Sequence, residues 1–262
     1  MGKQRIPVAL SIAGSDSGGG AGIQADLKAF ARCGVHGTTA ITAITAQNTV
    51  AVEAVTTVAP EAIVAQVRAV AADIGVDAVK IGMLGTAATV EAVVESLGLV
   101  GEAPVVIDPV MVAESGAVLL DEEARRALVE RLLPRTAVAT PNIPEARVLA
   151  ELGEGAGQEE LARAVQALGP RAVVVTGGHS EQLIDLFYDG EQMVEIEGEL
   201  HPDGAAHGSG CTHSSALAAF LAHGAEPLEA ARQARRIASA AVGAGLREIG
   251  AGPGPVNVLG LQ

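Results

Sequence analysis

Short apolar runs alternate along the chain with longer stretches in which apolar residues recur every three or four positions. The short runs are typical of buried β-strands, and the longer stretches are typical of amphipathic helices. The predicted strands are Val8–Ile12, Val52–Val58, Ala78–Ile81, Val105–Ile107, Val138–Thr140, Ala172–Thr176, Leu183–Tyr188 and Gln192–Ile196. The predicted helices are Ile23–Cys33, a helix that Pro60 opens and that includes Ile63 to Ile74, Thr89–Leu97, Asp121–Leu133, Pro144–Leu152, Glu159–Leu168, His213–His223 and Leu228–Val242.

This alternation of strands and helices predicts the fold class. It favours an α/β fold in three layers, with a mostly parallel central sheet and helices on both of its faces. Asp189-Gly190, between the last two predicted strands, is a β-hairpin signal. The sequence shows no internal repeat and no low-complexity linker, so we expect residues 1–262 to form a single domain.

The composition narrows the range of partners. The chain carries 17 Lys+Arg against 31 Asp+Glu, a formal net charge of −14, and only 2% aromatic residues. Nucleic-acid binding relies on basic contacts to phosphates and on aromatic stacking, so we expect no nucleic-acid partner. No apolar run approaches the length of a membrane span, so we expect no membrane partner. Cys33 and Cys211 lie far apart and form no C-x-x-C pair, which fits the reducing cytoplasm.

A glycine-rich loop, residues 14–22, follows the first predicted strand. Ligands of open α/β sheets gather at the carboxyl ends of strands, and glycines let backbone N–H groups approach a ligand closely. The loop is not a Walker A sequence, because no Lys-Ser/Thr follows Gly19. It is not a dinucleotide-binding fingerprint either, because Ile23 stands where the third glycine would fall. We expect it to bind a ligand; a plain flexible turn is the alternative.

A second glycine loop, Gly208-Ser209-Gly210-Cys211-Thr212, directly precedes an apolar helix. The free N–H groups and positive dipole end of such a helix form an anion site. Cys211 lies at this helix start, where we expect a lowered thiol pKa; a small buried residue is the alternative. His207 and His213 flank the loop, but no fourth ligand is spaced to complete a structural zinc site.

Acidic residues follow two further strands. Asp108 closes one predicted strand, and Asn142 and Glu145 follow the next one along the chain. Asn142 and Glu145 have the spacing of a helix N-cap with a capping box. Asp108 and Glu145 could equally hold Mg²⁺ through waters, as carboxylates commonly do beside phosphates. Both interpretations stay open.

Ordered blocks over nearly the whole chain resemble the hydroxymethylpyrimidine/phosphomethylpyrimidine kinases of thiamine biosynthesis, in the ribokinase-like superfamily. The order is specific to that family, whereas any one block would be weak evidence. The blocks are residues 13–16, 19–28, 45–49, 80–84, 108–112, 140–146, 177–179 and 207–212.

The resemblance implies ATP-dependent phosphoryl transfer to the hydroxymethyl group of a small pyrimidine and then to its monophosphate, in a cytoplasmic protein that forms a homo-oligomer, a dimer. It assigns the catalytic base to Cys211, with Gly208, Ser209 and Gly210 forming an anion hole. It places the substrate at Gln47, Asp26, Gly14, Met83 and Val110. It places the nucleotide at Asn142, Thr176 and Gly178, and Mg²⁺ at Asp108 and Glu145.

The chain departs from the family pattern on the nucleotide side. Thr176 stands where the family usually has Lys, and Glu114 and Ala117 stand where it often has Lys and Asp. Ala205-Ala206 replaces an Asn-Thr pair. These changes remove contacts that would hold ATP, so we expect weaker or slower use of ATP.

Two alternatives remain. A pyridoxine/pyridoxal kinase of the same superfamily is the first, and Gln47 argues against it because such relatives carry an apolar residue there. A non-catalytic pyrimidine-binding relative is the second, and the retained Cys211, Asp108 and Gly208–Gly210 argue against it.

Overall fold

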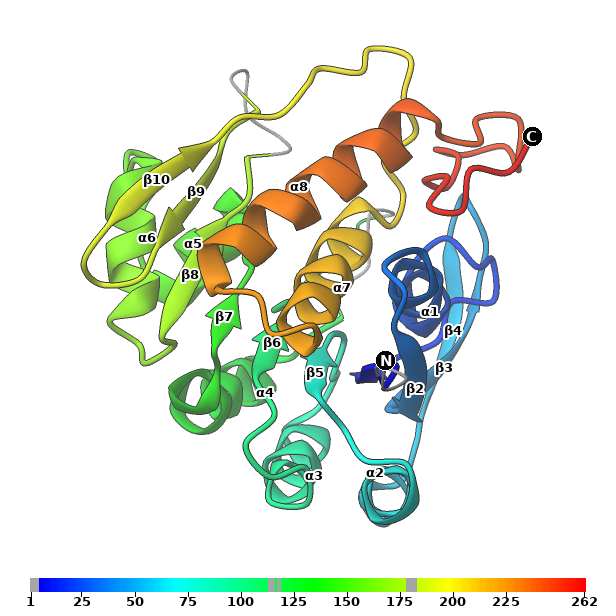
Figure 1. The fold of residues 1–262 in the computed structure, drawn as a ribbon, viewed down its shortest axis with the longest axis vertical. Helices are drawn as coiled ribbons and strands as arrows, with labels where there is room; N and C mark the ends of the chain where they lie inside the picture. The colour runs from blue at the N-terminus through cyan, green and yellow to red at the C-terminus, as the bar shows by residue number, and fades with distance from the viewer. Residues whose placement is uncertain (1–4, 113–115, 117–118, 178–182) are drawn as a thin grey trace.

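A large, mainly parallel sheet forms the centre of the protein in a computed structural model that describes residues 5–112, 116, 119–177 and 183–262. Within these residues, eight strands lie in the order β10-β9-β8-β7-β6-β5-β1-β2 (Figure 1). All neighbours from β8 to β2 pair in parallel, and β9 and β10 add an antiparallel edge. The strands are β1 (Val8–Ala13), β2 (His36–Ile41), β5 (Ala78–Ile81), β6 (Val105–Ile107), β7 (Val138–Ala139), β8 (Ala172–Val175), β9 (Asp185–Tyr188) and β10 (Met193–Ile196).

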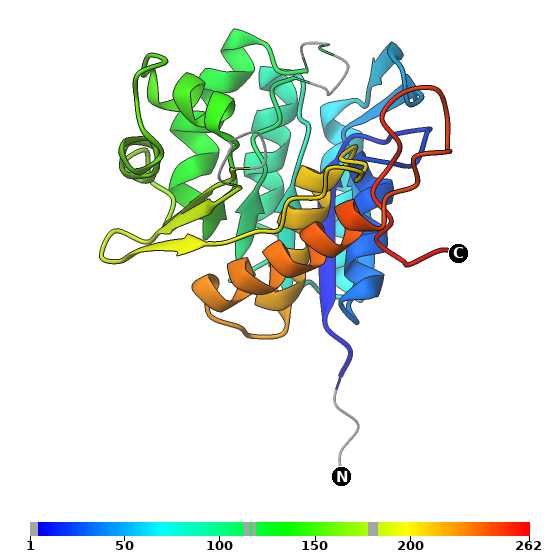
Figure 2. The same ribbon diagram turned by 90° about the horizontal axis from the view of Figure 1, so that it is seen from above.

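Helices cover both faces of this sheet, as Figure 2 shows from above. One face carries α1 (Gly22–Arg32), α7 (Ser209–Ala222) and α8 (Pro227–Gly243). The other carries α2 (Pro60–Asp73), α3 (Ala87–Leu97), α4 (Glu122–Ala127), α5 (Ile143–Ala150) and α6 (Gln158–Gln166). The predicted three-layer α/β fold is confirmed.

Strand periodicity explains why the sheet needs both layers. Val105 and Ile107 pack into the core beneath α2–α6, whereas Val106 between them packs beneath α1, α7 and α8. Successive side chains of a strand point to opposite faces, so an uninterrupted apolar run must be covered twice.

The structure differs from the sequence predictions in three places. Strand β2 and strand β3 (Ala43–Gln47) were not predicted, because their small and hydroxyl residues form no apolar run. The predicted helix Asp121–Leu133 holds α4 and then continues as a π-helical turn and a 3₁₀ turn to Arg135. Helix α7 begins at Ser209 rather than at His213, so Ser209, Gly210 and Cys211 form its first turn.

A second, two-stranded antiparallel sheet pairs β3 with β4 (Val52–Thr57). It lies beyond the β2 edge of the main sheet (Figure 1). Among the described residues, no helix combines the length and the apolar character needed to span a lipid bilayer.

Candidate active site

The start of α7 lies over the carboxyl end of β6. Asp108 follows β6 directly, and Ser214 Oγ of α7 donates a hydrogen bond of 3.0 Å to Asp108 Oδ2. A Cβ atom added to Gly210 would lie 3.9 Å from the same oxygen. Because the parallel strands all end at this edge, the first turn of α7 meets the loops that follow them.

A buried ion pair lies beneath this edge. Lys80 of β5 and Asp26 of α1 are both 0% exposed, and Lys80 Nζ lies 2.8 Å from Asp26 Oδ1. Ser11 Oγ of β1 and Ser215 Oγ of α7 donate to the same carboxylate at 2.5 and 2.7 Å. The structure therefore places Asp26 in a buried cluster that joins four elements, and its substrate role stays a prediction.

Cys211 has a different electrostatic environment from the expected one. Burial raises the pKa of its thiol to about 12; the charge of Lys80 opposes this shift, and the carboxylates of Asp26 and Asp108 add to it. A hydrogen bond from the Gly22 N–H to the sulfur also acts to lower the pKa. The prediction that the helix start lowers this pKa is wrong, because desolvation outweighs the dipole. Cys211 rests as a neutral thiol.

Two carboxyl groups, those of Asp108 and Glu145, interact at the strand ends. Burial and the charge of Asp108 together raise the pKa of Glu145 to about 8, against the opposing effect of backbone hydrogen bonds from Asn142 and Met111. Burial also raises the pKa of Asp108, against the opposing charge of Lys80. The charge of Asp108 disfavours the charge of Glu145, and a divalent cation would stabilise both carboxylates, so the pair fits Mg²⁺. No group of three His, Cys, Asp or Glu within the described ranges could hold a metal ion by itself, so the remaining ligands would be waters or phosphates.

Asn142 and Glu145 also cap a helix. The Glu145 N–H donates to Asn142 Oδ1 at 2.8 Å, and the Asn142 N–H donates to Glu145 Oε2 at 3.0 Å, completing a capping box at the start of α5. Asn142 forms a parallel bridge with Thr176, so these two predicted nucleotide residues are neighbours at the strand ends. Gly178, Glu114 and Ala117 lie outside the described residues.

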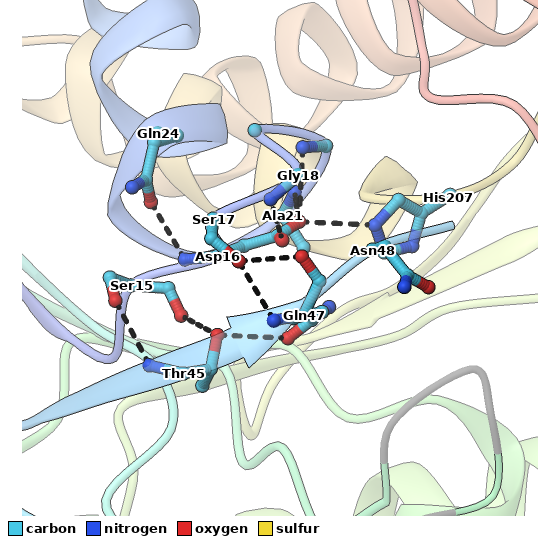
Figure 3. A network of polar contacts seen from close by, with 12 residues as sticks. Ser15, Asp16, Ser17, Gly18, Ala21, Gln24, Thr45, Gln47, Asn48 and His207 are labelled. Carbon is cyan, nitrogen blue, oxygen red and sulfur yellow. Dashed lines mark hydrogen bonds and ion pairs between the residues drawn. The ribbon is translucent and has the colours of Figure 1, made fainter. Parts of the chain in front are cut away.

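The predicted pyrimidine residues lie at the glycine loop. Gln47 ends β3, and its backbone exchanges two hydrogen bonds with Ser17 Oγ, at 2.6 and 2.8 Å (Figure 3). Gln47 Oε1 lies 3.4 Å from Thr45 Oγ1. Gly14 packs so closely on Met83 that a Cβ would overlap the Met83 methyl group. Val110 follows β6, where its N–H donates to the Asp108 carbonyl, and its substrate role stays a prediction.

Comparison with known proteins identifies the family. The sequence model of the phosphomethylpyrimidine kinase family matches residues 16–257. The chain belongs to this family. It is 48% identical to a hydroxymethylpyrimidine/phosphomethylpyrimidine kinase of Rhizobium meliloti, over 95% of this chain and 96% of that one.

Solved structures agree with the fold. The Staphylococcus aureus pyridoxal kinase in complex with ADP superimposes with a TM-score of 0.89 at 32% identity, over 97% of this chain and 94% of that one. The phosphomethylpyrimidine kinase of Clostridium difficile 630 gives a TM-score of 0.77 at 38% identity, over 88% of this chain and 97% of that one. The ribokinase-like fold and the kinase class are confirmed.

Lys80 and Asp16 received no role from the sequence, although both are buried in this family member. Lys80 interrupts a short strand that is otherwise apolar, and a lysine in a buried strand signals a buried partner. Asp16 is 1% exposed in the glycine loop, where its carboxylate accepts backbone hydrogen bonds. An acid among glycines was visible in the sequence, but its partners were not.

Breaking the buried ion pair should destabilise the fold. Lys80→Met would leave the Asp26 carboxylate buried without its cation, and we expect a loss of about 3–5 kcal/mol in the free energy of unfolding. The double variant Lys80→Met/Asp26→Asn should recover part of the loss. Urea titration followed by circular dichroism measures both; a loss below about 1 kcal/mol for Lys80→Met would contradict the assignment.

The raised thiol pKa should be visible in alkylation kinetics. In a Cys33→Ser background, we expect iodoacetamide to label Cys211 with a rate that still rises about tenfold per pH unit between pH 8 and pH 10, because the thiolate fraction is far from saturation. Free glutathione is the reference thiol. A rate that levels off between pH 9 and pH 10 would place the pKa near its ordinary value of 9.0 and contradict the prediction.

Proposed function

We propose that the protein is an ATP-dependent kinase that phosphorylates 4-amino-5-hydroxymethyl-2-methylpyrimidine and then its monophosphate, in thiamine biosynthesis. One observation carries the proposal: Cys211 lies in the first turn of α7, where it meets the glycine loop at Gly22 and the carboxylate of Asp108 across the sheet edge. A proton acceptor, an anion-binding helix start and a carboxylate pair thus share one place. The names of the relatives support the same activity.

The first turn of α7 would bind the transferred phosphoryl group. Gly208, Ser209 and Gly210 carry no bulky side chain there, so the positive end of the helix dipole is accessible to an anion. Phosphoryl transfer passes through a loose transition state, so positioning and charge stabilisation dominate, and the hydroxyl proton leaves late. For Cys211 to take that proton, its own thiol proton must leave first; the charge of Lys80 favours this thiolate, which then accepts the hydroxyl proton and becomes the thiol again.

Asp108 and Glu145 would hold Mg²⁺, which supplies positive charge that neutralises the phosphates of ATP. The unfavourable effect of the Asp108 charge on the Glu145 carboxylate supports this role. Asn142 and Thr176 would border the nucleotide at the ends of β7 and β8, and we propose Gly178 as a further nucleotide residue from the family pattern alone. With Thr176 at the position of the usual lysine, backbone N–H groups and the cation would do most of the phosphate binding.

A pyridoxal kinase is the second candidate function, because the pyridoxal kinase of Staphylococcus aureus superimposes so well. Gln47 discriminates between the two substrates. Its carboxamide has both a donor and an acceptor for an aminopyrimidine edge, and Ser17 fixes its backbone beside the glycine loop.

We also place the protein in the cytoplasm as a single domain. Cys33 and Cys211 are both free thiols, which supports a reducing compartment.

A second copy of the chain is the partner we propose for the β3–β4 sheet. Ile44, Ala46 and Ala54 share one exposed face of this sheet, and Ile44 is 56% exposed. Two-stranded sheets are marginal in water unless another surface covers them. Association of two copies through this face would cover it and give the homodimer.

Substrate assays test the proposed activity. With MgATP, we expect turnover of the hydroxymethylpyrimidine and of its monophosphate to exceed turnover of pyridoxal. Cys211→Ala is the control, and its kcat should fall by at least about 10²-fold, the lower range for general base catalysis. Faster phosphorylation of pyridoxal would overturn the substrate assignment, and near-normal turnover by Cys211→Ala would remove the cysteine from the base role.

Light scattering tests the dimer. We expect the purified protein to have twice the chain mass, and Ile44→Asp to reduce it to the chain mass by placing like charges opposite each other. The matched control is Leu200→Asp at another exposed apolar position, 71% exposed, which should stay dimeric. A monomeric native protein, or an unchanged mass for Ile44→Asp, would rule out this interface.

A further inference from the structure

A contact between distant parts of the sequence joins the glycine loop to the residue that precedes the anion hole. Asp16 Oδ2 lies 3.2 Å from His207 Nε2, 191 positions away in the chain (Figure 3). The same carboxylate accepts hydrogen bonds from the N–H groups of Gly18, Gly20 and Ala21, at 2.8, 3.0 and 2.8 Å. One side chain thus fixes the shape of the loop and its position.

The backbones of the two segments also touch. Gly208 has a φ of +84°, and a Cβ there would overlap the carbonyl oxygen of Gly20. A Cβ on Gly20 would in turn overlap the His207 ring. Glycine is required at position 208 because the two backbones meet there, and at position 20 a side chain would displace the His207 ring.

His207 is itself held in place by its backbone. Its carbonyl accepts a hydrogen bond of 3.0 Å from the Val256 N–H, and it forms a parallel bridge with Pro255. Burial acts to raise the pKa of Asp16, but His207 and the loop N–H groups outweigh it and lower the pKa, so Asp16 carries its charge at neutral pH. A charged carboxylate on a fixed imidazole is a directional constraint on the loop.

The loop held in this way touches both halves of the site. At Ser17, one residue after Asp16, it bonds the backbone of Gln47. At Gly22, where it ends, its N–H donates to the Cys211 sulfur. A displacement of the loop would therefore move the pyrimidine-binding end and the base relative to each other.

We propose that Asp16 and His207 are positioning residues, which lock the glycine loop to the start of α7 so that the substrate hydroxymethyl group meets Cys211 and the phosphoryl group in line. This inference takes the identity of its substrate from the proposed function. Neither side chain contacts the reacting atoms; each acts through Gly20, Gly22 and Gly208. Misplacement of reacting groups by about 1 Å can cost about 10²-fold in rate, so the lock would be felt in kcat.

Four variants test the lock kinetically. His207→Leu and Asp16→Asn should each lower kcat at least about tenfold, while the KM for ATP stays within about twofold. His207→Gln places an amide nitrogen near the position of Nε2 and should retain most of kcat. The double variant Asp16→Asn/His207→Leu should be no slower than the worse single variant, because the two residues act as a unit. Additive losses, or a glutamine variant as slow as the leucine variant, would overturn the proposal.

Hydrogen exchange measured by mass spectrometry tests the lock without substrate. His207→Leu should speed amide exchange in peptides that contain Gly18–Ala21, and peptides of β5 and β6 should be unchanged. The matched control is His223→Leu. The His223 ring contacts the Cys33 carbonyl instead, so this variant should leave exchange in the loop peptides and in the β5 and β6 peptides unchanged. Faster exchange throughout the protein would mean general destabilisation and would overturn the proposal.

Pyridoxal serves as a second acceptor in the kinetic series. If the native protein phosphorylates pyridoxal but not the pyrimidine, the proposed function fails. The kcat values of the four variants with pyridoxal then test the lock. Unchanged loop exchange in His207→Leu would overturn the lock even where the proposed function holds.

Discussion

The structure of the site depends on one buried ion pair. Lys80 and Asp26 are sealed from solvent, and Ser11 and Ser215 complete the hydrogen bonds of the carboxylate, so that strands β1 and β5 and helices α1 and α7 meet at a single charged cluster. Such a pair contributes little net stability, but leaving either partner alone is severely destabilising. It therefore sets how α7 sits on the sheet. Every group at the start of α7, Cys211 included, takes its position from this arrangement.

Charge is the second constraint, and it explains the abundance of glycine near the site. The chain has a net charge of −14 and three lysines, yet the proposed reaction requires it to bind the phosphates of ATP and, in the second step, a phosphorylated acceptor. One of those lysines is consumed in the buried pair, and Lys28 donates to the carbonyl of Gly19. In the proposed site, attraction for phosphates comes from backbone N–H groups, a helix dipole and Mg²⁺, and glycine lets the backbone approach a phosphate closely. The scarcity of lysines also affects Cys211. Lys80 favours the thiolate, but burial and the carboxylates of Asp26 and Asp108 oppose it, so the thiol stays protonated in the resting protein.

Most strands of the main sheet were predicted from the sequence, because a strand buried on both faces has a continuous run of apolar residues. Strands β2 and β3 were missed because their small, hydroxyl and amide residues form no continuous apolar run. The family blocks brought Gly14, Met83, Asp108, Glu145 and Cys211 to the same end of the molecule before any coordinates were known. The sequence could not give the pKa of Cys211, which depends on burial by residues far along the chain. Nor could it pair Asp16 with His207, because no local pattern encodes a contact between such distant residues.

The bridge from His207 to Pro255 has a consequence for the time at which the site is assembled. The glycine loop is among the first segments to leave the ribosome, but its partners at residues 207–208, and the segment that braces them near residue 256, are made much later. Contacts of such long sequence separation slow folding, since the chain between them must first be ordered. During synthesis one face of the sheet stays without α7 and α8, and the catalytic centre stays open, until residues 207–256 have been made. Acquisition of activity would thus be a late event in the life of each molecule.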